Sequence, residues 1–266
     1  MEIRFEGGVV AEAVPGQIGS VPRFSVGGRF VVVSPYADRW GREKFIGATF
    51  GSMDWLWEGD DEIRFDKETR DLVGVMVALP EEEDADWDGT EWLRLLRESG
   101  GVRARAVEDF SARPMEVRWV APGAKAIVCA YSAFPSGTSG LRRLRVAPDF
   151  DLVAAADGTY AGWILENPAD CVVEAFEDRR PDAAADAFRE TLAEFLDLFV
   201  EPRIDAMQDE DPALLVRLEA LLTRVSALPP DPRHDAMRRW MLQVREDWYA
   251  IAAVGSHVRQ RASGDV

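Results

Sequence analysis

Acidic side chains are the most prominent chemical groups in this sequence, and one stretch concentrates them. Between Asp54 and Glu91 there are fifteen Asp and Glu residues against only three basic residues. Their densest run, residues 80–89, predicts a solvated loop because like charges repel and resist burial. An acidic surface of this kind speeds encounter with a basic protein. The partner-binding residues that we predict are Asp60, Asp61, Glu81, Glu82, Glu83, Asp84 and Asp86. The alternative is a solvated face without a partner.

Other reactive groups are sparse. The two histidines, His234 and His257, have no Cys or His at metal-ligand spacing, so we predict surface histidines and no metal site. The sequence contains no G-x-S-x-G nucleophile motif, no G-x-G-x-x-G and no P-loop, so we predict no cofactor. Cys129 and Cys171 lie in apolar runs, which is typical of buried thiols.

Tryptophan offers a second kind of site. The chain has nine tryptophans, which fill a core by default but can also line a ligand pocket. Nearby carboxylates would then serve as general acids and bases. The pocket-wall candidates under this alternative are Trp55, Trp57, Trp119, Trp163, Trp240 and Trp248.

Net charge and composition limit the classes of partner that the chain is expected to bind. The 266 residues carry a net charge of −17, and the isoelectric point is about 4.6. This charge argues against nucleic acid and anionic membranes, both of which bind clustered Lys and Arg. Because only three basic residues are lysine, the bias also fits a GC-rich bacterial genome. The N-terminus lacks a secretory signal and no apolar run is long enough to span a membrane, so we predict a soluble cytoplasmic protein.

The elements that must position these groups begin with a hairpin at residues 62–79. Ile63 and Phe65 alternate with charged residues, Asp66 begins a turn, and a nearly continuous apolar run follows. That run predicts a strand inside a sheet. We predict a loop at 34–44, strands within 45–57 and a short helix at 90–99. The further predicted strands are 29–34, 115–121, 125–134, 141–147, 151–156, 159–166 and 171–176.

Helical periodicity replaces the strand pattern after Pro181. Asp182 is the predicted cap of a helix that reaches about Val200, with an apolar stripe that includes Leu192. An acid precedes a proline at 201–202, 211–212 and 231–232, and each pair predicts a helix start. The last helix is expected to end at Gly255.

Together these patterns predict an α+β protein. A mostly antiparallel, curved β-rich domain at 1–178 precedes three to four helices at 179–258, either packed on it or forming a small lobe, and a flexible tail follows at 259–266. The leading functional hypothesis is a non-catalytic acidic protein that binds or regulates a basic partner, for example as an immunity or antitoxin protein. The alternative is a metal-free enzyme or small-molecule-binding protein with a tryptophan-lined pocket.

Overall fold

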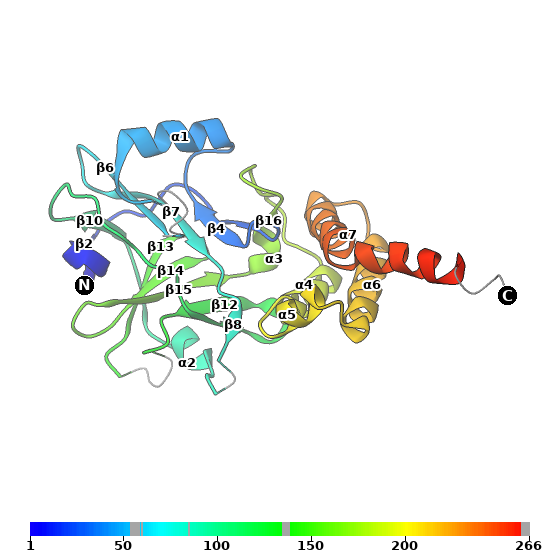
Figure 1. The fold of residues 1–266 in the computed structure, drawn as a ribbon. Helices are drawn as coiled ribbons and strands as arrows, with labels where there is room; N and C mark the ends of the chain where they lie inside the picture. Colours follow the sequence, from blue (N-terminus) through cyan, green and yellow to red (C-terminus); the bar gives the residue numbers. More distant parts are fainter. Residues whose placement is uncertain (54–58, 60, 85, 135–138, 262–266) are drawn as a thin grey trace.

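A computed structural model describes residues 1–53, 59, 61–84, 86–134 and 139–261, with side chains up to residue 249. Three mostly antiparallel sheets form the first two thirds of the chain, and helices form the last third (Figure 1). The predicted α+β class is therefore confirmed. Within the described residues, no helix combines the length and the apolar character that crossing a membrane requires.

The 62–79 hairpin lies inside a six-stranded sheet. In spatial order its strands are β16 (Val172–Val173), β3 (Arg23–Ser25), β4 (Phe30–Val33), β7 (Leu72–Ala78), β6 (Glu62–Asp66) and β5 (Thr49–Ser52). The apolar strand β7 pairs on both edges, with β4 and β6, which confirms its predicted interior position. The Asp66 carboxylate accepts the Glu68 and Thr69 amides at 2.9 and 2.7 Å, as its turn chemistry predicts.

The later strands form a second, seven-stranded sheet. In spatial order they are β8 (Glu82–Glu83), β11 (Val117–Val120), β12 (Ala126–Ala130), β15 (Tyr160–Glu166), β14 (Phe150–Ala154), β13 (Arg142–Ala147) and β9 (Arg97–Ser99). Only the two edge strands, β8 and β9, run parallel to their neighbours among these pairs. Asp157 accepts the Thr159 amide in the tight turn between β14 and β15, as predicted for Asp157-Gly158.

One hydrophobic core connects these layers. Phe24 and Val77 of the six-stranded sheet belong to the same buried cluster as Ile127 and Trp163 of the seven-stranded sheet. A smaller cluster, which includes Trp92, packs on strands of the seven-stranded sheet. A three-stranded sheet completes the β-rich part. Its strands are β1 (Glu2–Arg4), β2 (Val10–Val14) and β10 (Gly101–Ala104).

The C-terminal helices lie on one side of the sheets (Figure 1). They are α4 (Asp186–Leu198), α5 (Arg203–Gln208), α6 (Pro212–Ser226) and α7 (Pro232–Arg261). Leu192 and the rest of the predicted α4 stripe join the main core, so the sheets and the helices bury apolar surface together. Asp211 caps α6 through the amides of Ala213 and Leu214, with Pro212 at the first helical position.

Several local predictions were wrong. Within residues 34–57, a helix, α1 (Arg39–Ala48), begins inside the predicted loop, because Asp38 caps it by accepting the Gly41 amide. The predicted helix at 90–99 is the single turn α2 (Thr90–Leu93), and β9 follows it. Helix α4 begins at Asp186 rather than next to Asp182.

The last helix also differs from its predicted end, since α7 continues through Gly255 to Arg261. His234 is buried rather than on the surface. Its ring packs 4.6 Å from the Phe188 ring, and its Nδ1 lies 2.8 Å from the Pro229 carbonyl oxygen. The remaining short elements are η1 (Glu6–Gly8), η2 (Pro122–Ala124) and α3 (Pro168–Cys171).

Candidate functional site

The acidic run after β7 forms a link between the two large sheets. We call residues 79–84 the acidic connection. Leu79 donates its amide to the Arg29 carbonyl next to β4, whereas Glu82 and Glu83 pair with Val117 and Arg118 of β11. The predicted loop therefore contains a two-residue edge strand, which fixes where its carboxylates point.

A buried arginine attaches this connection to the helices. The Arg118 guanidinium is almost fully buried and donates to the Pro80 carbonyl at 3.0 Å. It also donates to the Leu196 and Phe199 carbonyls, at 2.6 and 2.8 Å, at the end of α4. Three carbonyl acceptors satisfy most of the donors of this fork, so the charge can remain buried. Arg118 therefore joins the sheet, the acidic connection and α4.

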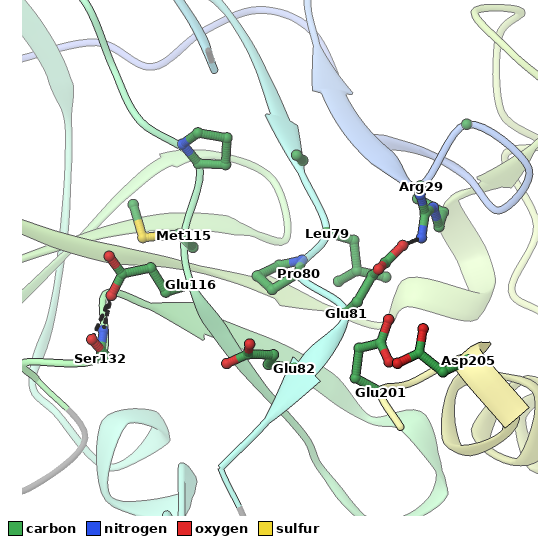
Figure 2. A pocket seen from close by; sticks show the side chains of 13 residues that line it. Arg29, Leu79, Pro80, Glu81, Glu82, Met115, Glu116, Ser132, Glu201 and Asp205 are labelled. Carbon is green, nitrogen blue, oxygen red and sulfur yellow. Dashed lines mark hydrogen bonds and ion pairs between the residues drawn. The ribbon is translucent and has the colours of Figure 1, made fainter. Parts of the chain in front are cut away.

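The acidic connection forms one wall of an open groove of about 990 Å³, which we call the acidic groove. Its lining combines five carboxylates with a single guanidinium, that of Arg29 (Figure 2). The carboxylates belong to Glu81, Glu82, Glu116, Glu201 and Asp205. They come from segments far apart in the sequence. The Glu201 amide connects two of these segments by donating to the Glu81 carbonyl at 2.9 Å.

Two of the five carboxylates are already neutralised. Glu81 forms an ion pair with Arg29. Glu116 accepts the Ser132 amide at 2.8 Å (Figure 2). It also lies 3.2 Å from the Arg113 guanidinium. The Ser132 hydrogen bonds and the Arg113 charge lower the pKa of Glu116, so this side chain is a stable carboxylate. It is held in place by its own neighbours.

The other three carboxylates lack such partners. Within the described part of the chain, Glu82, Glu201 and Asp205 form no ion pair with a cationic side chain. Partial burial raises the pKa of Glu201, and the charge and hydrogen bond of Asp205 and the charge of Glu82 raise it further. Figure 2 shows the Glu201 and Asp205 carboxylates together at one side of the groove. The Arg29 charge offsets only part of this effect, so this part of the surface keeps an excess of negative charge.

A second groove lies on the other side of the acidic connection. It has a volume of about 730 Å³, and we call it the aromatic groove because Trp87 and Trp119 line it. Glu83 and Asp84 of the acidic connection also line it, and Glu201 lines both grooves. The two grooves are thus neighbours that share one carboxylate.

The structure does not bring the predicted partner-binding residues together at one site. Glu81 and Glu82 line the acidic groove, and Glu83 and Asp84 line the aromatic groove. Asp86 is exposed and lines neither, and Asp60 lies outside the described residues. Asp61 corrects the prediction of a surface contact, because it is 2% exposed and accepts the Ala78 amide at 2.8 Å.

The predicted tryptophan wall is dispersed. Trp119 lines the aromatic groove, whereas Trp240 lines a separate surface pocket beside α7. Trp163 is completely buried in the main core, and Trp248 packs partly buried against it. Trp55 and Trp57 lie outside the described residues. The described members of this set therefore do not surround one common cavity.

Sequence reasoning missed Glu116, Glu201 and Asp205 as members of the site. Glu201 did carry a signal, since it precedes a proline, but that pattern indicated only a helix start. In the structure the Glu201–Pro202 peptide is cis, and α5 begins one residue later. Nothing in the local sequence places Glu116 beside the acidic connection.

Covalent and metal chemistry find little support in the described residues. Among them, no group of three or more His, Cys, Asp or Glu side chains is arranged to hold a metal ion. Cys129 and Cys171 are free and buried, and burial raises the pKa of both thiols. The two grooves on the described surface instead combine carboxylates with the indoles of Trp87 and Trp119.

Comparison with known proteins adds no family: no family model matches the chain, and searches of curated proteins and of solved structures found no match.

Proposed function

We propose that the protein is a non-catalytic interaction protein whose acidic groove binds a cationic segment of a basic protein partner. The observation that supports this best is the set of three carboxylates, Glu82, Glu201 and Asp205, that lack ion pairs with described cations. Lysine or arginine side chains of a partner would supply the missing positive charge. An immunity or antitoxin protein that neutralises a basic toxin is one concrete form of this role.

The raised pKa of Glu201 supports the same proposal. Its neighbours Asp205 and Glu82 oppose its ionisation, so the free protein carries electrostatic repulsion in the groove. A bound cation would reduce that repulsion and lower the pKa of Glu201. Binding is then expected to weaken as the pH falls toward the range in which these carboxylates become protonated.

The setting that we propose for this role is the cytoplasm of a bacterium. Two cysteines that remain free and buried fit a reducing compartment. The scarcity of lysine relative to arginine fits a GC-rich bacterial genome. Nucleic acids and anionic membranes are disfavoured as partners because the net charge of −17 would repel them.

Affinity purification of the intact chain from its own cells tests the proposal. We expect a basic protein in stoichiometric amount, with less recovered as the salt concentration rises, because salt screens exposed charges. The variant Glu82→Gln/Glu201→Gln/Asp205→Asn removes the three unpaired charges. We expect it to weaken the complex by about tenfold or more.

The control variant is Glu12→Gln/Glu68→Gln/Glu190→Gln, which changes the net charge equally at exposed positions outside the groove. It should bind the partner as the natural chain does. Recovery of no partner at low or moderate salt would contradict the proposal. Equal weakening in both variants would also contradict it, because net charge alone would then explain the binding.

An acid–base enzyme or small-molecule carrier is the second candidate. The adjacent Glu201 and Asp205 carboxyls favour it, since a pair with one raised pKa can hold and transfer a proton. We place it second because the two tryptophans that line a groove with Glu201, Trp87 and Trp119, lie in the aromatic groove, which Asp205 does not line. Native mass spectrometry of the protein purified from its host distinguishes the two candidates. A retained small molecule that Glu201→Gln abolishes would favour this one.

A further inference from the structure

The aromatic groove differs from the acidic groove in having an aromatic wall. Four carboxylates and two guanidinium groups line it. Both guanidinium groups already have partners: Arg203 contacts Asp197 at 2.7 Å, and Arg118 donates to three carbonyls and to Glu83. Asp197 is also paired with Arg217. Asp84 and Glu201 are left to attract an incoming cation.

The aromatic wall is held firmly from behind. Gly89 lies so close to the Trp119 indole that a Cβ atom there would be 2.6 Å from its Cε3 atom. Trp119 is only partly buried, and its accessible surface faces the groove that it lines. An indole is the strongest cation-binding aromatic surface among the natural side chains. The groove thus offers a fixed indole next to carboxylates.

A second indole, that of Trp87, borders the same groove. Trp87 also lines the groove and is 5% exposed, and its indole N–H has no acceptor among the described residues. Buried indole N–H groups usually have an acceptor. The N–H groups of Trp92, Trp163 and Trp240 also lack one among the described residues, and the Trp87 N–H lies below the accessible surface. Trp87 therefore contributes its ring to the groove wall and not a free donor.

We propose that the aromatic groove is the anchor subsite for one arginine residue of the partner, whose guanidinium stacks on Trp119 and pairs with Asp84 and Glu201. This inference rests on the proposed function and specifies the partner chemistry. Arginine fits better than lysine because a planar guanidinium can stack on an indole and hydrogen bond to carboxylates at the same time.

Blocked amino acids test the subsite without the partner. The probes are N-acetyl-arginine methylamide and N-acetyl-lysine methylamide, titrated into the full-length protein labelled with nitrogen-15. Indole N–H resonances report binding, and single Trp→Phe variants assign Trp87 and Trp119. We expect the arginine probe to shift both resonances and to bind about threefold or more tightly than the lysine probe.

Two variants and one control complete the test. Trp119→Leu removes the aromatic face, and Trp119→Phe retains a weaker one if the leucine variant is unstable. Binding of the arginine probe should fall in the order natural chain, Trp119→Phe, Trp119→Leu. Trp40→Phe is the control, because Trp40 is 73% exposed on α1 and lines neither groove. It should leave binding unchanged.

The possible results separate this inference from the proposed function. Equal affinity for the two probes, or no shift at Trp119, would overturn the arginine subsite. If the partner is still lost in the Glu82/Glu201/Asp205 variant but not in Trp119→Leu, the proposed function stands and the subsite falls. Weaker binding of the partner to both variants, together with tighter binding of the arginine probe than of the lysine probe, supports the inference.

Discussion

Two groups of carboxylates in this molecule show how differently the same side chains can be used. On the seven-stranded sheet, Asp151 accepts from Arg143 at 2.5 Å and from Arg145 at 2.6 Å. Glu166 accepts from the same two guanidinium groups at 2.5 Å each. We call these four residues the paired network. In the acidic groove, by contrast, Glu201 faces other carboxylates, and they raise its pKa.

The difference separates structural acids from acids that are available for binding. Asp151 is completely buried and can remain charged there because two guanidinium groups surround it. The groove carboxylates remain at the surface, where water makes their repulsion tolerable. Counting acids along the sequence cannot distinguish these cases, whereas the position of arginine partners does. Four predictions test or calibrate this comparison, and they are given in order of expected effect.

The largest effect is expected from breaking the paired network. Asp151→Ala removes the fully buried partner of Arg143 and leaves Glu166 as its remaining carboxylate, and breaking a buried ion pair costs about 3–5 kcal/mol. Urea unfolding followed by circular dichroism measures this change in the free energy of unfolding. Glu98→Gln removes an exposed ion pair with Arg142 on the neighbouring strand and should cost at most about 1 kcal/mol. Similar values for the two variants would show that the network is not structural.

The substitution of a buried leucine, Leu192, provides a reference value for the free energy of unfolding. Leu192 is completely buried in α4, next to the helix end that Arg118 holds. Leu192→Ala should lower the free energy of unfolding by about 2–5 kcal/mol, through lost burial and the resulting cavity. The same urea experiment measures it. An unchanged midpoint would mean that α4 does not belong to the cooperative core.

The pH dependence of stability should have opposite signs in the two groups. Burial alone would raise the pKa of Glu166, but hydrogen bonds and charges from Arg145 and Arg143 outweigh it and lower the pKa. A lowered folded-state pKa gives stability above the unfolded value, near 4.3, that is lost as the pH falls through the folded-state pKa. Glu166→Gln should therefore destabilise the protein at pH 7 and much less at acidic pH. A constant difference across this pH range would contradict the pairing.

The smallest effect is expected at Glu201, and it has the reverse sign. Its raised folded-state pKa favours folding below the unfolded value and costs stability as the pH rises through the folded-state pKa. Glu201→Gln should leave the melting temperature at pH 7 unchanged or slightly higher. The corresponding gain in the free energy of unfolding should be less than about 1 kcal/mol, because the site is exposed to solvent. Scanning fluorimetry at pH 7 and pH 4 measures it. A lower melting temperature at pH 7 would show that Glu201 has a structural partner.

Sequence patterns predicted the parts of the fold that depend on neighbouring residues. Asp66 and the Asp157-Gly158 pair fix tight turns locally, and the apolar run of β7 indicates a strand inside a sheet, where it pairs with β4 and β6. Helix α1 was missed because it has no fully buried residue and therefore no clear apolar stripe. Strand β9 was missed because its pairing with β13 joins residues more than forty positions apart.

The candidate site was predictable only on one of its walls. The dense acids of residues 81–84 were identified from the sequence, and the structure places all four along the two grooves. Glu116, Glu201 and Asp205 come from other segments, and tertiary packing brings them there. Asp61 was included because it belongs to the same acidic stretch, yet the Ala78 amide binds it in the interior.

The position of Arg118 has a consequence for how the grooves respond to a ligand. One side chain on the sheet fixes both the acidic connection and the end of α4, so the two walls cannot move apart independently. The groove walls are therefore already in place before a ligand binds. The protein then loses little conformational entropy on binding. Such preorganisation favours a long residence time of a bound ligand over broad adaptability.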